Sequence, residues 1–114
     1  MPYDEKLADR VREALLAYTT EIEEKRMFSG LCFMVKGKMC VCVSRDELMC
    51  RIGPEATAAA LERDDCRPMI HSGRTLKDYV YVAPKGYKSR KDFDGWIAAA
   101  MAFNKEAKAS KKQA

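Results

Sequence analysis

The chain has 114 residues, of which 47% are apolar and 33% charged, and its formal net charge is +4. This length suits one domain around one hydrophobic core, and the composition excludes a disordered or membrane-embedded chain. The N-terminus is acidic and polar, and no apolar run approaches the roughly 20 residues of a membrane span, so we expect a cytoplasmic protein without membrane contact. The five cysteines lie mostly in apolar segments, which predicts buried thiols rather than a disulfide framework.

The first predicted element is an amphipathic helix over residues 4 to 18, with Asp4 placed to cap its N-terminus. Acidic residues then break the period, and residues 25 to 28 are expected to enter a sheet as a short strand. The apolar positions that recur in the helix at intervals of three and four are Leu7, Val11, Ala14, Leu15 and Tyr18.

Three apolar segments follow, at residues 31 to 35, 38 to 43 and 47 to 52, and they predict antiparallel strands. Lys36-Gly37 and Arg45-Asp46 fit two-residue turns, which set which side chains share a face. One face is then expected to pack against helices: Cys32, Met34, Met39, Val41, Val43, Leu48, Cys50 and Ile52. The other face is expected to present a charged border around an apolar middle, formed by Leu31, Phe33, Cys40, Cys42 and Met49.

The second half of the chain predicts a short alanine-rich helix over residues 54 to 63, started by Gly53-Pro54. An extended connection with a turn at Ser72-Gly73 leads to a strand at 79 to 82. A final amphipathic helix begins after Ser89 and buries Trp96. The order predicts an α+β fold, in which helices cover one face of an antiparallel sheet. We expect a single domain over residues 1–108 and a disordered basic tail over 109–114.

Several short motifs resemble, in their order and spacing, the N-terminal domain of the bacterial TfoX/Sxy proteins. The resemblance runs over nearly the entire chain, with Ser29 where that family commonly has a second glycine. It implies a helix-flanked antiparallel sheet, a relation to regulators of natural competence, and no known catalytic activity or catalytic residues. The motifs are Tyr3-Asp4-Glu5-Lys6-Leu7, residues 25 to 31, the hairpin around Lys36-Gly37-Lys38-Met39, Gly53-Pro54-Glu55, Arg67-Pro68-Met69, and Gly73-Arg74 with Tyr79-Val80-Tyr81-Val82.

Protein association is the function that we expect first, through the apolar middle of the second sheet face. Leu31, Phe33, Cys40, Cys42 and Met49 would form an exposed patch there, which small domains seldom leave bare. A partner protein or a second copy of the chain, in a homodimer, could cover it. The alternative is that the final helix or the connection over residues 67 to 76 buries the same face within the monomer.

Nucleic-acid binding is the second hypothesis. Basic residues between Arg67 and Lys91 alternate with tyrosines, and together they could contact phosphates and stack on bases. The simpler interpretation is a solvated rim, because 17 acidic residues are spread through the chain and no nucleic-acid-binding signature is present. The candidate contacts are Arg67, Arg74, Lys77, Lys88 and Arg90.

A thiol or zinc function of Cys40, Cys42 and Cys66 is the weakest hypothesis, since their spacing fits no usual zinc pattern. His71 is the one histidine of the chain, and it lies in a predicted connection that favours an exposed side chain over a catalytic base. We therefore expect a non-enzymatic protein with no catalytic residue, no cofactor and no bound metal.

Overall fold

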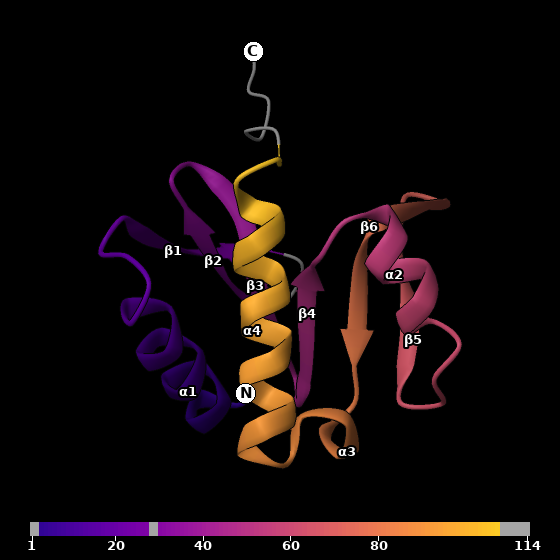
Figure 1. Ribbon diagram of the computed structural model, residues 1–114, viewed down its shortest axis with the longest axis horizontal. Coiled ribbons are helices and arrows are strands. Elements are labelled where there is room, and N and C mark those ends of the chain that lie inside the picture. Colours follow the sequence, from indigo (N-terminus) through magenta and orange to yellow (C-terminus); the bar gives the residue numbers. More distant parts are fainter. Residues whose placement is uncertain (1–2, 28–29, 108–114) are drawn as a thin grey trace.

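The computed structural model describes residues 3–27 and 30–107 (Figure 1). In these ranges the elements are a helix, four strands, a helix, two strands and two helices. The order that the sequence predicts is a helix, three or four strands, a helix, one or two strands and a helix, and the structure agrees with it except for one additional short helix before the last. The helices are α1 (Glu5–Leu16), α2 (Pro54–Ala60), α3 (Pro84–Tyr87) and α4 (Arg90–Asn104). The strands are β1 (Ile22–Met27), β2 (Gly30–Val35), β3 (Lys38–Ser44), β4 (Glu47–Arg51), β5 (Cys66–His71) and β6 (Arg74–Val82).

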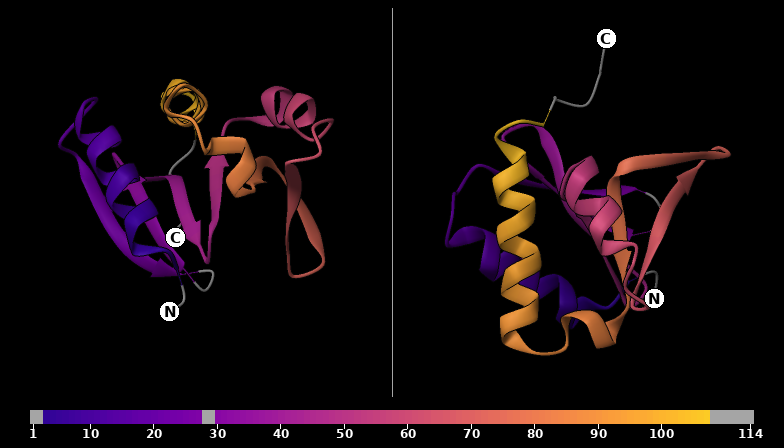
Figure 2. Two further views of the ribbon diagram at one scale, coloured as in Figure 1. Left: turned by 90° about the horizontal axis from the view of Figure 1, so that it is seen from below. Right: turned by 45° about the vertical axis from the view of Figure 1, so that its right-hand side comes forward.

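All six strands form one antiparallel sheet in the order β1-β2-β3-β4-β6-β5. The helices lie on one face of this sheet, with α4 across its middle, α1 toward β1 and β2, and α2 toward β6 (Figure 2). The predicted α+β fold with helices on one face is therefore confirmed. Within the described residues, no helix combines the length and the apolar character that crossing a membrane requires.

Local signals explain where the elements begin and turn. The Asp4 side chain accepts hydrogen bonds from the Lys6 and Leu7 amides at the start of α1, and Ser89 accepts one from the Asp92 amide at the start of α4. Both are N-caps that satisfy otherwise unpaired donors. The β2–β3 turn uses positive φ at both of its central residues, as a tight hairpin requires.

Several boundaries differ from the predictions: α2 ends at Ala60 rather than at residue 63, and β6 begins at Arg74 rather than at residue 79. Helix α1 ends at Leu16, so Tyr18 lies beyond it and is 52% exposed. Strand β1 begins at Ile22, three residues before the predicted start. The charged residues there do not prevent a strand, because β1 is an edge strand and can carry exposed charges. The predicted connection after Cys66 is a strand, and β5 and β6 form a hairpin. Phe28, Ser29 and the basic tail over 109–114 lie outside the described residues.

A one-residue irregularity between β2 and β3 decides which side chains face the helices. Val35 pairs with Lys38 and Met34 with Met39, as a two-residue turn demands, but Phe33 then pairs with Val41. Cys40 is the extra residue, a β-bulge. Beyond the bulge the pairing is shifted by one, and a shift of one residue exchanges the two faces of a strand.

The bulge corrects several predicted side-chain positions. Leu31, Phe33 and Cys40 belong to the core between the sheet and the helices, with exposed fractions of 6%, 0% and 1%. They do not lie on the second face of the sheet, so they are not available to bind a partner protein. Five residues lie on the helix side as predicted, Val41, Val43, Leu48, Cys50 and Ile52. Three that were expected there lie on the second face instead, Cys32, Met34 and Met39.

Candidate functional site

The second sheet face holds a separate buried cluster. Its partly buried neighbours are Met27, Leu76, Tyr79 and Tyr81. The predicted positions of Cys42 and Met49 on this face are confirmed, but both are almost fully buried, at 2% and 1% exposed. This cluster, which we call the sulfur cluster, consists of Cys32, Met34, Met39, Cys42, Met49 and Met69.

Two of the cysteines in the sulfur cluster are bonded to each other. Cys32 on β2 lies directly opposite Cys42 on β3, with their Cα atoms 4.0 Å apart, and the two form a disulfide. The prediction that all five cysteines are buried thiols is wrong for this pair. The bulge at Cys40 is the reason, because without it Cys32 would face Val41.

The other three cysteines lie on the helix side and are poor nucleophiles. The Cys40 Sγ lies 3.8 Å from the Met101 Sδ, and burial raises the pKa of the Cys40 thiol to about 12. Burial and the adjacent Asp65 carboxylate raise the pKa of Cys66 to about 12, and burial also raises the pKa of Cys50. A high pKa keeps these thiols protonated and unreactive near neutral pH.

The predicted set of Cys40, Cys42 and Cys66 is therefore divided between the two faces. Cys42 is bonded to Cys32 on the second face, whereas Cys40 and Cys66 pack with the helix-side core. No group of three or more histidine, cysteine, aspartate or glutamate side chains gathers for a metal in the described ranges. The structure contradicts a zinc site or a low-pKa thiol formed by these three cysteines.

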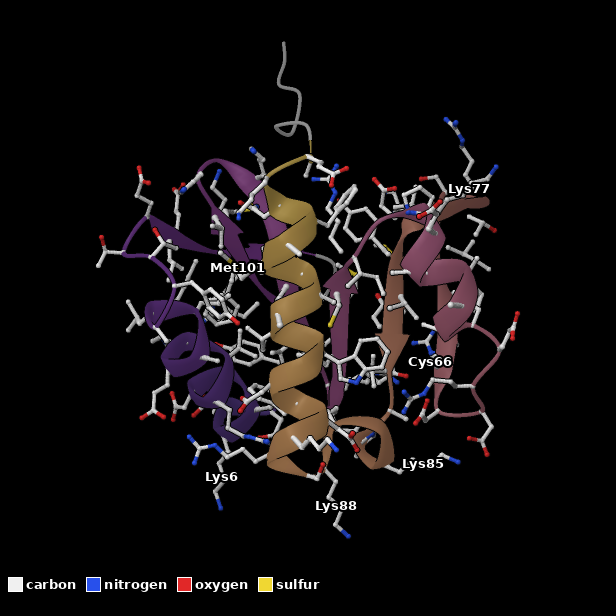
Figure 3. The ribbon with its side chains drawn as sticks, in the orientation of Figure 1. Lys6, Cys66, Lys77, Lys85, Lys88 and Met101 are labelled. Carbon is white, nitrogen blue, oxygen red and sulfur yellow. A yellow bond between two sulfur atoms is a disulfide. The ribbon has the colours of Figure 1, made fainter. Side chains whose placement is uncertain are left out.

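The five predicted nucleic-acid contacts do not form one surface. Lys77 lies at one end of the molecule and Lys88 at the opposite end, beside the start of α4 (Figure 3). Arg90 is close to Lys88 in sequence and approaches Asp94 at 3.7 Å. Arg67 donates to the Glu47 carboxylate and stacks 4.2 Å from the centre of the Tyr81 ring. Arg67, Arg74 and Lys77 all belong to the β5–β6 hairpin, and Arg67 is already paired with Glu47.

We call residues 66–77 of that hairpin, which run from the start of β5 through the turn into β6, the hairpin arm; its tip projects from the body (Figure 2). Met69 anchors the arm, since its side chain is 2% exposed within the sulfur cluster. The next residue, Ile70, points to the other face by strand alternation, and it is 62% exposed. Among the described residues it is the most exposed large apolar side chain, ahead of Leu16 and Tyr18 at 52% each.

The arm also has a one-sided charge. Residues 66–77 include Arg67, Arg74 and Lys77 and no acidic residue. The turn at its tip is tight, with φ of 55° at Ser72 and 77° at Gly73. An exposed apolar side chain beside basic residues on a short, well-anchored hairpin is suited to contact with an acidic surface.

A groove of about 580 Å³ lies between α1 and α4, and charged side chains line much of it. The Arg10 guanidinium lies 4.1 Å from the centre of the Phe93 ring, which closes one part of the groove. Glu13, Arg90 and Asp94 line the rest together with Tyr18. None of the described lining residues is a thiol, a serine or a histidine, so the groove lacks the usual nucleophile and base.

The sequence interpretation missed Ile70 and the Cys32–Cys42 pair. Ile70 lies between Met69 and His71, two residues after Pro68, in a segment where the sequence predicts a connection. The pair had a signal in the spacing around the β2–β3 turn. Cys32 and Met34 are two residues apart, whereas Met39 and Cys42 are three apart. Cys32 can therefore lie opposite Cys42, with Met34 opposite Met39, only if the second strand contains one extra residue.

Comparison with known proteins identifies one family. The family model described as TfoX N-terminal domain matches residues 14–104, from the last turn of α1 to the end of α4. No curated protein and no solved structure gives a match.

Proposed function

Because this chain belongs to the TfoX N-terminal domain family, we propose that it is a non-enzymatic regulatory domain that acts by binding another protein. The family is named for regulators of bacterial competence. We therefore propose that the chain takes part in the control of transcription. A cytoplasmic location stays a prediction that goes with this role. The proposal does not extend to any reaction catalysed by the chain.

The observation that carries the proposal is the exposed Ile70 on the hairpin arm. An isoleucine that is 62% exposed gains free energy when a partner removes its apolar surface from water, at about 25 cal/mol per Å². The buried Met69 beside it fixes the position of the arm. A contact made by a fixed arm loses less conformational entropy on binding than a contact made by a flexible loop.

The charge of the hairpin arm indicates which kind of partner protein it would bind. The arm carries three basic residues and no acidic one, so we expect a protein with an acidic surface around an apolar pocket. Arg67 is already paired with Glu47, which leaves Arg74 and Lys77 to contact acidic residues of the partner. Such rim charges speed association and exclude wrong partners more than they add affinity.

In the described part of the chain, the candidate nucleophile and base that the sequence offers are not brought together. Cys66 and His71 stand at the two ends of β5, about 16 Å apart at the usual rise of a strand. Raised thiol pKa values at Cys40 and Cys66 act against nucleophilic catalysis. Binding by the hairpin arm requires none of these groups.

The test compares Ile70→Asp with Leu16→Asp, since Leu16 is a similarly exposed apolar residue on α1. Both variants should keep the wild-type fold by circular dichroism. Each protein is used to isolate partners from the host cell, and solution mass is followed by light scattering over a concentration series. We expect Ile70→Asp alone to lose a stoichiometric partner or self-association. Equal binding by all three proteins would contradict the proposal.

Nucleic acid is a distinct outcome of the same experiment. If Arg74→Ala and Lys77→Ala weaken binding to a DNA duplex and the affinity falls steeply with salt, phosphate contacts would replace the protein contact as the function of the arm. Under the proposed function, these variants alter the rate and salt dependence of protein association and leave DNA binding weak.

A further inference from the structure

The sulfur cluster has an unusual composition. All six of its buried members carry sulfur, as does Met27 among its partly buried neighbours. The helix-side core has 21 buried members, of which only Cys40 and Cys50 contain sulfur. Apolar packing alone does not require this segregation, because leucine, isoleucine and valine fill the core on the other face of the same sheet.

Strand register brings three of these sulfur-bearing residues into one row. Cys32 on β2 lies opposite Cys42 on β3, and Cys42 lies opposite Met49 on β4. Residues directly opposite one another on adjacent strands have Cβ atoms about 5 Å apart. Met34 and Met39 form the neighbouring pair on the same face. Cys32 and Met49 flank Cys42 on its two sides, so the long and flexible Met49 side chain has only to extend over Cys42 to bring its thioether to the two cysteine sulfurs.

This donor set selects a soft metal ion. Thiolate and thioether sulfur prefer Cu(I), whereas zinc sites are completed by cysteine, histidine or carboxylate ligands. The described residues offer no third ligand of the latter kinds. We propose that Cys32, Cys42 and Met49 bind one Cu(I) ion when the cysteine pair is reduced. This site is independent of the proposed function of the hairpin arm.

The chemistry of the site links metal binding to the redox state of the pair. Reduction of the Cys32–Cys42 disulfide by a phosphine yields two thiols: the phosphine gives up two electrons and becomes the phosphine oxide, and one water molecule supplies the oxygen and the two protons. Binding of Cu(I) then releases the thiol protons to solvent, and copper does not change its oxidation state. The oxidised chain has no thiolate at either position, so it cannot form the site.

Burial and charge are compatible with this assignment. Two thiolates and one Cu(I) leave a single negative charge, and Lys25 on β1 is the residue opposite Cys32 in the same row. A bound metal ion overrides the effect of burial on a thiol, because coordination deprotonates the thiol outright. Met34, Met39 and Met69 keep the site almost free of water, at 5% exposure or less, and methionine side chains are flexible enough to admit an ion.

The experiment uses the full chain, reduced with a phosphine under anaerobic conditions and titrated with Cu(I) in competition with a chromophoric chelator. We expect one equivalent of Cu(I) and a thiolate-to-copper absorption band in the near ultraviolet. The double variant Cys32→Ser, Cys42→Ser should weaken binding by more than the roughly 10–100-fold that even supporting residues of metal sites contribute. Met49→Leu should weaken it by about tenfold with little change in packing.

Two substitutions on the helix side serve as controls. Cys66→Ala and Met101→Leu each remove one sulfur that packs with the helix-side core, and both variants should bind Cu(I) like the wild type. The oxidised wild type should bind none. Failure of the reduced wild type to compete for Cu(I), or unchanged affinity in both the cysteine double variant and the folded Met49→Leu variant, would overturn the proposal.

Discussion

The Trp96 indole N–H donates a buried hydrogen bond of 2.9 Å to the Gly86 carbonyl and so joins α4 to α3. Trp96 is 9% exposed and belongs to the helix-side core. The Arg63 guanidinium lies 5.3 Å from the centre of its ring, which adds a contact from the segment after α2. A single side chain therefore connects three segments that are separate in sequence.

Substitution of Trp96 should reveal this connection. We expect Trp96→Ala to lower the free energy of unfolding by about 3–5 kcal/mol, as large-to-small core changes do. Trp96→Phe keeps a ring and leaves the Gly86 carbonyl without its donor, so it should cost about 1–3 kcal/mol. Urea unfolding followed by circular dichroism measures both. A loss well under 1 kcal/mol for Trp96→Ala would show that the ring is not a core residue.

Phe33 provides a test of the bulged register. Its side chain is 0% exposed beneath α1 and α4, so Phe33→Asp should prevent folding, since a buried carboxylate without a partner is strongly unfavourable. The milder Phe33→Ala should cost about 3–5 kcal/mol. Leu16→Asp, at a site 52% exposed, is the matched control and should change stability by about 0.5 kcal/mol or less. A folded, stable Phe33→Asp protein would contradict the bulged register, because it would indicate that Phe33 lies on the second face of the sheet.

The ion pair between Arg12 and Glu24 joins α1 to β1 and predicts a pH dependence. The Arg12 Nη2 donates to the Glu24 Oε1 at 2.9 Å, and this hydrogen bond holds the pKa of Glu24 below its usual value. Stability from a lowered carboxylate pKa is present above the unfolded-state pKa and is lost as the pH falls through the folded-state pKa. Both side chains are about one-third exposed, so the pair should contribute about 1 kcal/mol or less.

Unfolding of the wild type and Glu24→Gln should therefore differ at neutral pH by that small amount. The difference should vanish well below the ordinary glutamate pKa of about 4.3, where both proteins carry an uncharged side chain. High salt should also reduce it. A difference between the two proteins that grows on acidification would contradict the assigned role of the ion pair.

Cys66 should react slowly for a cysteine that is only partly buried. Its pKa is raised to about 12, so the thiolate fraction at pH values near 8 is far below that of an unperturbed thiol with a pKa of about 8.5. We expect alkylation by iodoacetamide, followed by mass spectrometry, to be much slower at Cys66 in the folded chain than in urea. Rapid alkylation of Cys66 in the folded chain would contradict the raised pKa and support the hypothesis that Cys66 is a reactive thiol.

Much of the fold could be predicted because its signals are local. The caps at Asp4 and Ser89 depend on a side chain and amides within three residues. The turn at Lys36-Gly37 depends on residues that accept positive φ. Membership of the family and the order of helices and strands followed from such short motifs, read along the chain.

Only the tertiary structure decided the two faces of the sheet and therefore the candidate sites. Side chains alternate along a strand, so the single extra residue at Cys40 moves Phe33 into the core and brings Cys32 opposite Cys42. Packing then buries the sulfur cluster and leaves Ile70 exposed at the end of the arm. Burial depends on which distant segments meet, and the changed pairing has only a weak local signature, the unequal Cys/Met spacing on the two sides of the β2–β3 turn.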